Sequence, residues 1–231
     1  MKLLALDTSS VACTVALQVG GDVVERHEEQ PREHTRILLP MLREVMTEAG
    51  LEARELDAIV LGNGPGSFIG MRIAASVAQG LAFGSGLGIV PVSSLAAVAA
   101  EVLVDADIAE VVVAQDAHMN EVYLGVFRRG EDGLPVPQMP ERLAGHGTIS
   151  ELRQPATGRR IAAGFGWQRY PDLLAHNVDR LAGVVDVLHP RARYLLGLGA
   201  ARFALEGSIG PQDVCPAYLR HKVAEKPEPV S

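Results

Sequence analysis

The sequence G-N-G-P-G-S-F-I-G-M-R, residues 62–72, joins two segments with different hydrophobic patterns. Residues 58–61 before it are all apolar and predict a buried strand, and the Ala-, Gly- and Leu-rich residues 70–83 predict a helix. Four glycines between a strand and a helix suit a phosphate-binding turn, because free N–H groups at a helix N-terminus bind anions. The common phosphate motifs are absent, since Met71-Arg72 replaces the Lys-Ser/Thr of a P-loop and Ser67 replaces the third glycine of a dinucleotide motif. The run therefore predicts a tight turn rather than a nucleotide site.

The residues around this turn predict a unit of alternating strands and helices. Short apolar runs bounded by Gly, Ser and Asp predict strands, and the segment that Gly50 ends has the apolar spacing of a helix. The predicted strands cover residues 3–7, 13–19, 23–26, 58–61 and 89–92, and the predicted helices cover 33–49, 70–83 and a segment that starts at Ser93-Ser94. This pattern is typical of an α/β fold.

A later stretch of the chain repeats its beginning. Residues 112–116, V-V-A-Q-D, form a strand-like run that ends in Asp, as do residues 3–7. The run 122–127 follows it at the spacing at which 13–19 follows the first. Self-similarity of this kind predicts a duplicated α/β unit.

The second half of the chain has fewer regular elements. It contains a loop at 130–140, a short strand at 161–163, a helix at about 190–205 and a tail at 225–229 that we expect to fray. We predict two lobes, 1–106 and a degenerate 107–231, with the last helix as a candidate to pack back on the first lobe.

The composition of the 231 residues limits the functions that the chain can have. Its net charge of −7 argues against binding a nucleic acid by itself, because such binding relies on neutralising phosphates. Two cysteines, Cys13 and Cys215, form no disulfide framework, which suits a reducing cytosol. Residues 73–100 carry no charge, but Gly84–Gly88 interrupt them, so we predict no membrane span and a cytoplasmic protein.

Several motifs together resemble one family. They are Asp7-Thr8-Ser9, the pattern G-P-G-S-F-x-G-x-R at 64–72, E-H-T-x-x-L-L-P at 33–40, D-A-x-M-x-E-V-Y at 116–123 and P-x-Y-L-R at 216–220. In this order they resemble the bacterial TsaB (YeaZ) family. The chain departs from the family pattern at Ile69, where Thr is usual, and at His118, where Arg is usual.

The resemblance implies a duplicated actin/Hsp70-like ATPase fold with two lobes, the second one reduced. It also implies a non-catalytic subunit of the complex that transfers a threonylcarbamoyl group to adenosine 37 of tRNA. The implied partners are a catalytic homologue similar to TsaD, which this chain would activate, and a small ATPase similar to TsaE. The tRNA would be reached indirectly through the complex, and the assembled complex could bind ATP.

The turn that follows the first strand is the candidate cofactor site. The residues at vestigial phosphate-loop positions are Asp7, Thr8, Ser9, Gly64, Gly66 and Ser67. In an alternative interpretation, Asp7 and Ser9 only cap the turn through hydrogen bonds to its backbone. We expect no cofactor on the isolated chain.

Metal catalysis is not expected. The catalytic relative of the family carries two histidines four residues apart, and here His34 is followed by Leu38. Two other functions stay open as alternatives: an independent small-molecule kinase or ATPase, and a glycoprotease-like metallopeptidase.

The two predicted helices of the first lobe are candidates for a partner interface. Residues 33–49 place an apolar arc, including Leu39, over more of the helix than one sheet needs to cover. The candidate interface residues are His34, Leu38, Met41, Leu42, Val45, Met71, Arg72, Ala75, Ala78 and Gln79. The same helices would form a homodimer when the chain is alone. The sequence does not determine which side of the first arc faces the core.

Overall fold

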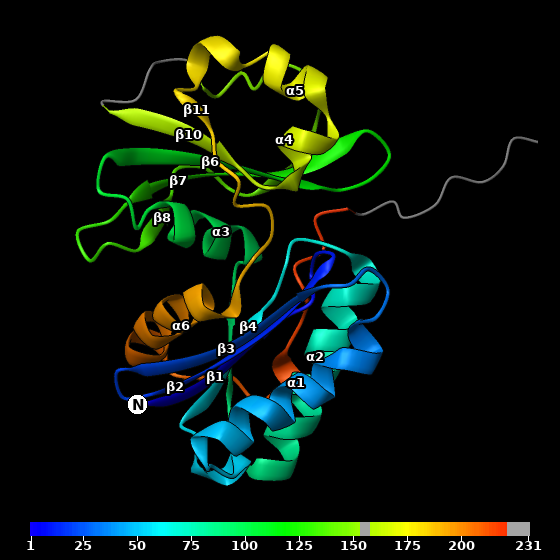
Figure 1. The fold of residues 1–231 in the computed structure, drawn as a ribbon, viewed down its shortest axis with the longest axis vertical. Helices are drawn as coiled ribbons and strands as arrows, with labels where there is room; N and C mark the ends of the chain where they lie inside the picture. Colours follow the sequence, from blue (N-terminus) through cyan, green and yellow to red (C-terminus); the bar gives the residue numbers. More distant parts are fainter. Residues whose placement is uncertain (153–157, 221–231) are drawn as a thin grey trace, which may run out of the picture.

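The computed structural model of the chain describes residues 1–152 and 158–220, which form two lobes with one sheet each (Figure 1). The strand order is β3-β2-β1-β4-β5 in the first sheet and β11-β10-β6-β7-β8 in the second, where β9 also pairs with β7. The first sheet contains β1 (Lys2–Asp7), β2 (Ala12–Val19), β3 (Asp22–Glu29), β4 (Ala58–Gly62) and β5 (Ile89–Val92). The second contains β6 (Ile108–Asp116), β7 (Glu121–Arg129), β8 (Pro135–Pro137), β9 (Arg142–Gly145), β10 (Arg159–Ala163) and β11 (Gly183–Val184). The α-helices are α1 (His34–Ala49), α2 (Phe68–Ser85), α3 (Ser94–Val102), α4 (Phe165–Arg169), α5 (Pro171–Ala175) and α6 (Ala192–Glu206).

The central strand β1 is buried on both faces of the first sheet. It runs antiparallel to β2 and parallel to β4, and its side chains alternate between two hydrophobic clusters. Leu4 and Leu6 pack with α1 and α2, whereas Leu3 and Ala5 pack with α6. Helices on both faces explain why this strand is continuously apolar.

The strand β6 takes the equivalent place in the second sheet. Val111 and Val113 pack with α3, and Val112 and Ala114 pack with α4 and α5. The buried indole of Trp167 in α4 donates from Nε1 to the carbonyl of Val112 at 3.1 Å. The second lobe therefore repeats the layers of the first.

The two sheets show the predicted duplication. β1 pairs with β2 as β6 pairs with β7, both antiparallel, and β1 pairs with β4 as β6 pairs with β10, both parallel. Asp7 and Asp116 end the two equivalent strands. The two-lobed α/β fold is confirmed, and the second lobe is reduced, since α4 and α5 have five residues each.

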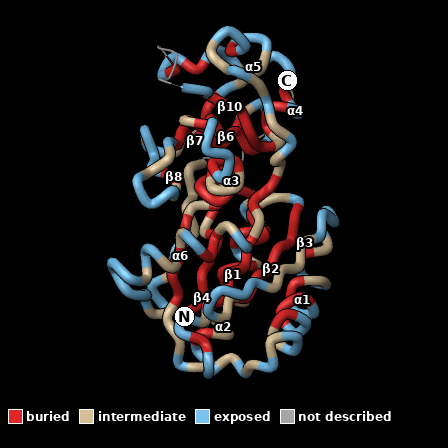
Figure 2. Tube along the Cα trace, turned by 60° about the vertical axis from the view of Figure 1, so that its left-hand side comes forward, coloured by how far each residue is buried: buried red, intermediate tan, exposed pale blue. Residues whose placement is uncertain are grey.

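One helix from each half of the chain packs on the sheet of the other lobe. The helix α3 precedes residue 106 but packs on the second sheet, and α6 from the second half packs on the first sheet. The two helices contact each other between the buried centres of the lobes (Figures 1 and 2). The predicted boundary at 106 lies between α3 and β6, and the apolar face of α3 is covered by β6 and β7 beyond it.

The predicted frayed tail at 225–229 lies outside the described residues. Within the residues that the structure describes, no helix has the length and apolar content that crossing a membrane requires.

Candidate functional site

A cleft with a volume of about 590 Å³ lies between the lobes. Its first-lobe wall is formed by the turn after β1 and by the N-terminus of α2. Its second-lobe wall includes the end of β6 together with Phe165 and His189. The cleft therefore lies where the two equivalent strands end, the usual ligand site of α/β sheets.

The carboxylate of Asp7 lies behind this cleft. Its side chain is 1% exposed; Oδ1 accepts from the backbone N–H of Ser9 at 2.6 Å, and Oδ2 accepts from the hydroxyl of Ser94. The Ser94 oxygen in turn accepts from the N–H of Gly64 at 3.0 Å. Burial raises the pKa of Asp7, and the hydrogen bonds from Ser94 and Ser9 oppose this shift only in part. Asp7 thus holds the two turns and α3 together.

The glycines of the loop allow two turns of the chain to touch. A Cβ on Gly66 would lie 2.2 Å from the carbonyl oxygen of Ser9, and a Cβ on Gly70 would lie 1.9 Å from that of Thr8. The N–H of Ser67 donates to the same Ser9 oxygen at 2.7 Å, and the Thr8 hydroxyl donates to the Gly70 carbonyl at 2.7 Å. Packing between the turns therefore explains the glycine pattern without a ligand.

This packing leaves three of the six candidate cofactor residues at the cleft and buries the other three. Ser9, Gly66 and Ser67 line the cleft, and Ser67 is also the N-cap of α2, where its hydroxyl accepts from Gly70 at 3.2 Å. The others, Asp7, Thr8 and Gly64, are buried beneath it. The structure brings all six together but opens only three of them to the cleft.

The carboxylate of Asp116 on the second-lobe wall is also hydrogen bonded within the protein. Oδ1 of Asp116 accepts from the His118 N–H and from the Tyr170 hydroxyl, both at 2.8 Å. Burial and this neighbouring carboxylate raise the pKa of Tyr170 to about 12. A Cβ on Gly164 would lie 2.3 Å from the carbonyl oxygen of Ala114, so this glycine too is required by packing.

Two buried histidines face the cleft from opposite lobes. His34 is 7% exposed and hydrogen bonds through Nε2 to the Ser10 carbonyl at 2.9 Å, and His189 is 6% exposed with its ring 5.5 Å from that of Phe165. The Nδ1 atoms of both are buried and have no hydrogen-bond partner among the described residues. Burial lowers the pKa of His189, which favours the neutral ring.

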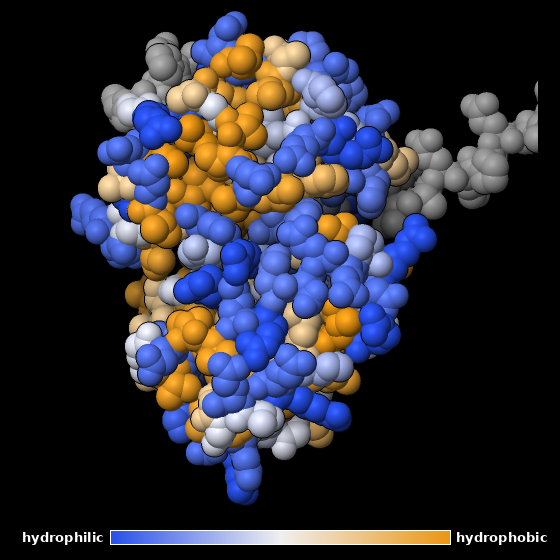
Figure 3. All heavy atoms as spheres, in the orientation of Figure 1, coloured by the Kyte–Doolittle hydropathy of each residue, from blue (hydrophilic) through white to orange (hydrophobic). Residues whose placement is uncertain are grey.

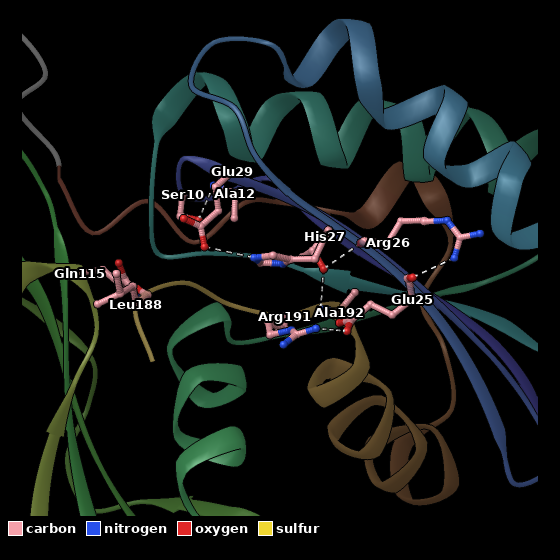
Figure 4. Close-up of polar contacts among 11 residues, drawn as sticks. Ser10, Ala12, Glu25, Arg26, His27, Glu29, Gln115, Leu188, Arg191 and Ala192 are labelled. Carbon is pink, nitrogen blue, oxygen red and sulfur yellow. Dashed lines mark hydrogen bonds and ion pairs between the residues drawn. The ribbon is translucent and has the colours of Figure 1, made fainter. Parts of the chain in front are cut away.

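The cleft residues Gln115, Phe165 and His189 were not predicted. Gln115 donates from Nε2 to the Leu188 carbonyl at 2.6 Å, and a few residues farther along the chain Arg191 pairs with Glu25 of β3 at 2.6 Å (Figure 4). No local motif marks these residues, because folding brings them together from separate parts of the second half, on the wall of the cleft that faces the first lobe.

Metal-ligating side chains do not form a cluster in the described part of the chain, where no three His, Cys, Asp or Glu residues are placed to hold an ion. Leu38, at the position of the second family histidine, is 1% exposed and belongs to the core.

The structure corrects which faces of α1 and α2 are free. Seven predicted interface residues are at most 6% exposed and pack in the core: Leu38, Met41, Leu42, Val45, Met71, Ala75 and Ala78. The first sheet covers the centre of each apolar arc, so these side chains pack within the chain. Leu38 and Leu42 also line the hollows that open beside α1. Of the other three, His34 is buried, Arg72 is exposed, and Gln79 donates to the Pro211 carbonyl at 2.8 Å.

The edges of the apolar arcs stay uncovered and form a groove between α1 and α2. One hollow of about 380 Å³ is lined by Leu39, Ile69 and Ile73, among others, and a second of about 460 Å³ continues it toward Leu51. The side chains of Leu39 and Ile69 are 51% and 70% exposed. Orange atoms in Figure 3, at the right of the lower lobe where Figure 1 places these helices, show apolar surface on this side. We call this surface the α1–α2 groove.

The duplicated sheets with a cleft between them define a protein of the actin/Hsp70-like superfold. The family model "TsaD: tRNA N6-adenosine threonylcarbamoyltransferase" matches residues 23–226. The chain is 36% identical to the tRNA threonylcarbamoyladenosine biosynthesis protein TsaB of Escherichia coli, over 99% of both chains, and 36% identical to that of Haemophilus influenzae, over 99% of this chain and 98% of the relative. The solved structure "YeaZ from Pseudomonas aeruginosa" is 34% identical, with a TM-score of 0.83 over 94% of this chain and 99% of that one. The chain belongs to the TsaB (YeaZ) family.

Proposed function

We propose that this chain is a non-catalytic subunit in the formation of threonylcarbamoyladenosine in tRNA. The observation that carries the proposal is the 36% sequence identity, over 99% of this chain, to proteins named for this biosynthesis. A catalytic homologue similar to TsaD is the partner, and this chain activates it by stabilising its active form. The tRNA is reached through the complex, in the cytoplasm.

The α1–α2 groove supports a role in assembly. Large exposed apolar side chains such as Leu39 and Ile69 are unusual on a monomer when they form one continuous surface. A homologous partner would present equivalent helices, so helix-on-helix packing would bury the groove on both sides. The same packing between two copies of this chain gives a homodimer when the partner is absent, and a TsaE-like ATPase docks on the assembled pair with its ATP.

The carboxylate at the end of β1 supports the non-catalytic part of the proposal. Both oxygens of Asp7 are hydrogen bonded inside the protein, and the side chain is 1% exposed. A group that acts on a substrate must reach it within hydrogen-bond distance. Asp7 instead stabilises the turn and α3, so it serves the fold.

Reconstitution with the TsaD-like protein, the TsaE-like protein, tRNA and ATP tests this function. Leu39→Arg would bury an unpaired charge in the interface, so we expect at least about 30-fold weaker binding to the partner and a matching loss of product. Val136→Arg is the matched control, since Val136 is 46% exposed on β8 of the second lobe. Equal binding by both variants would refute the groove as the interface.

The role of Asp7 is tested in the same assay. Asp7→Asn keeps an acceptor for the Ser9 N–H, so the complex should assemble and form modified tRNA at the normal rate. A complex that assembles and binds tRNA but forms no product would show that Asp7 is catalytic.

The cleft of about 590 Å³ favours one second candidate, an independent small-molecule kinase or ATPase. Calorimetry of the isolated chain with ATP and Mg²⁺ decides between them. Micromolar binding that His189→Phe abolishes would support the kinase or ATPase, and no binding would support the assembly role.

A further inference from the structure

The segment that follows α6, residues 207–220, first runs along the first lobe. Ile209 forms an antiparallel bridge with Ile89 of β5, with both N–H···O distances at 2.9 Å. Farther on, the side chain of Asn63 donates to the Cys215 carbonyl at 2.8 Å, and the Ala217 N–H donates to the Asn63 carbonyl at 3.0 Å. The segment is thus fixed to the ends of two first-lobe strands.

The same segment ends on the second lobe. The guanidinium of Arg220 pairs with Glu121, at the start of β7, at 2.7 Å and donates to the Ala117 carbonyl at 2.9 Å. The Arg220 side chain is 16% exposed. In Figure 1 this red segment reaches the second lobe on the α2 side of the molecule, away from α6. It therefore links the lobes on the side opposite to the connections through α3 and α6.

An aromatic cluster joins this segment to the α1–α2 groove. Arg72 donates from Nε to the Tyr218 hydroxyl at 3.0 Å, and its guanidinium lies 3.7 Å from the centre of the Phe68 ring. The rings of Phe68 and Tyr218 are 5.5 Å apart. Phe68 and Arg72 also line the groove, whereas Tyr218 and Arg220 do not. Phe68 and Arg72, which line the groove, are therefore held in position by Tyr218 of the segment 207–220.

We propose that residues 207–220 are a latch that holds the two lobes at a fixed angle, and that Arg72 couples this latch to the α1–α2 groove. With the latch closed, Tyr218 fixes the Arg72 and Phe68 side chains in the positions that a partner meets. With the latch open, these side chains lose that support, and a partner must order them at a cost in affinity. Because coupling between two sites is reciprocal, a partner in the groove also stabilises the closed latch. The coupling to a partner rests on the proposed function, and the latch itself does not.

The latch is tested on the isolated chain by the distance between the lobes. Spin labels on Thr47→Cys and Asp172→Cys, both exposed, report this distance by double electron–electron resonance in a Cys215→Ser background. Arg220→Gln should broaden the distance distribution and move it to longer values. Arg142→Gln is the matched control, because Arg142 pairs with Glu151 at 2.8 Å inside the second lobe. The same narrow distribution for Arg220→Gln and the control would overturn the latch.

The coupling is tested by the affinity for the TsaD-like partner. Arg220→Gln and Tyr218→Phe leave the groove lining unchanged, and each should weaken binding by about 5-fold or more, whereas Arg142→Gln should not. If Arg220→Gln broadens the distance distribution but binds the partner with unchanged affinity, the latch is supported and its coupling to the groove is refuted. A wild-type chain that does not bind the partner would refute the proposed function and the coupling with it, while the distances alone would still decide the latch.

Discussion

At the scale of single residues, the polar groups beside the cleft form hydrogen bonds within the chain and stabilise its turns. Asp7 binds the Ser9 N–H and the Ser94 hydroxyl, and Gly66 and Gly70 let the loop touch the turn at Thr8-Ser9. In a nucleotide-binding relative of this fold, such a turn would leave its N–H groups free for phosphate. Here the N–H groups of Ser9, Gly64 and Ser67 are already used within the protein.

The buried state of Asp7 predicts a pH dependence of stability. Burial raises its pKa in the folded chain, so above about pH 4 the unfolded chain binds fewer protons than the folded one. The free energy of unfolding should therefore fall as the pH rises through this range, until the folded carboxyl also ionises. Asp7→Asn should remove this loss, so its stability relative to wild type should increase with pH in urea unfolding curves. A constant difference from pH 4 to 7 would show that Asp7 is ionised in the fold.

At the scale of elements, α1 and α2 are each apolar on more than the face that the sheet covers. Val45 is fully buried and Leu39 is 51% exposed, although both lie on the apolar arc of α1. The first sheet covers one part of each apolar arc, and the uncovered part lines the α1–α2 groove. Each helix therefore packs in the core with one part of its apolar arc and leaves the other part exposed at the surface.

The two faces of α1 should respond differently to truncation. Met41→Ala removes a side chain that is 5% exposed and should lower the free energy of unfolding by about 2–5 kcal/mol, because it leaves a cavity. Leu39→Ala should change it by less than about 0.5 kcal/mol. Denaturant unfolding measures both values. A large loss of monomer stability for Leu39→Ala would mean that the groove is already filled from within the chain.

At the scale of the whole molecule, the exchanged helices tie the lobes together. α6 from the second half packs so closely on β4 that a Cβ on Gly199 would lie 2.3 Å from the Val60 side chain. α3 from the first half covers the opposite sheet, and the two helices touch. Neither lobe has a complete core without a helix from the other half of the chain.

This exchange predicts that the lobes unfold together. Gly199→Ala perturbs only the first sheet and should cost about 1–3 kcal/mol through overpacking. Trp167, the one tryptophan of the chain, is buried in the second lobe and should report the same shift of the urea midpoint as far-UV circular dichroism. If the fluorescence midpoint stays unchanged while the dichroism midpoint falls, the lobes are independent.

The sequence by itself determined β1 to β7, β10, the helices α1, α2, α3 and α6, the duplication ending at Asp7 and Asp116, and the tight turn at residues 62–72, since each depends on local periodicity or glycine. It missed the short strands β8, β9 and β11, and β8 lies inside the predicted loop 130–140, because two to four residues are too few to show a period. Only the tertiary structure decided which part of the α1 arc faces the sheet, because a wide apolar arc fits a sheet in several rotations. It also decided the exchange of α3 and α6 and the placement of His34 and His189 along one cleft. These contacts join residues far apart in the chain, and their positions depend on how two finished sheets pack, which no local pattern contains.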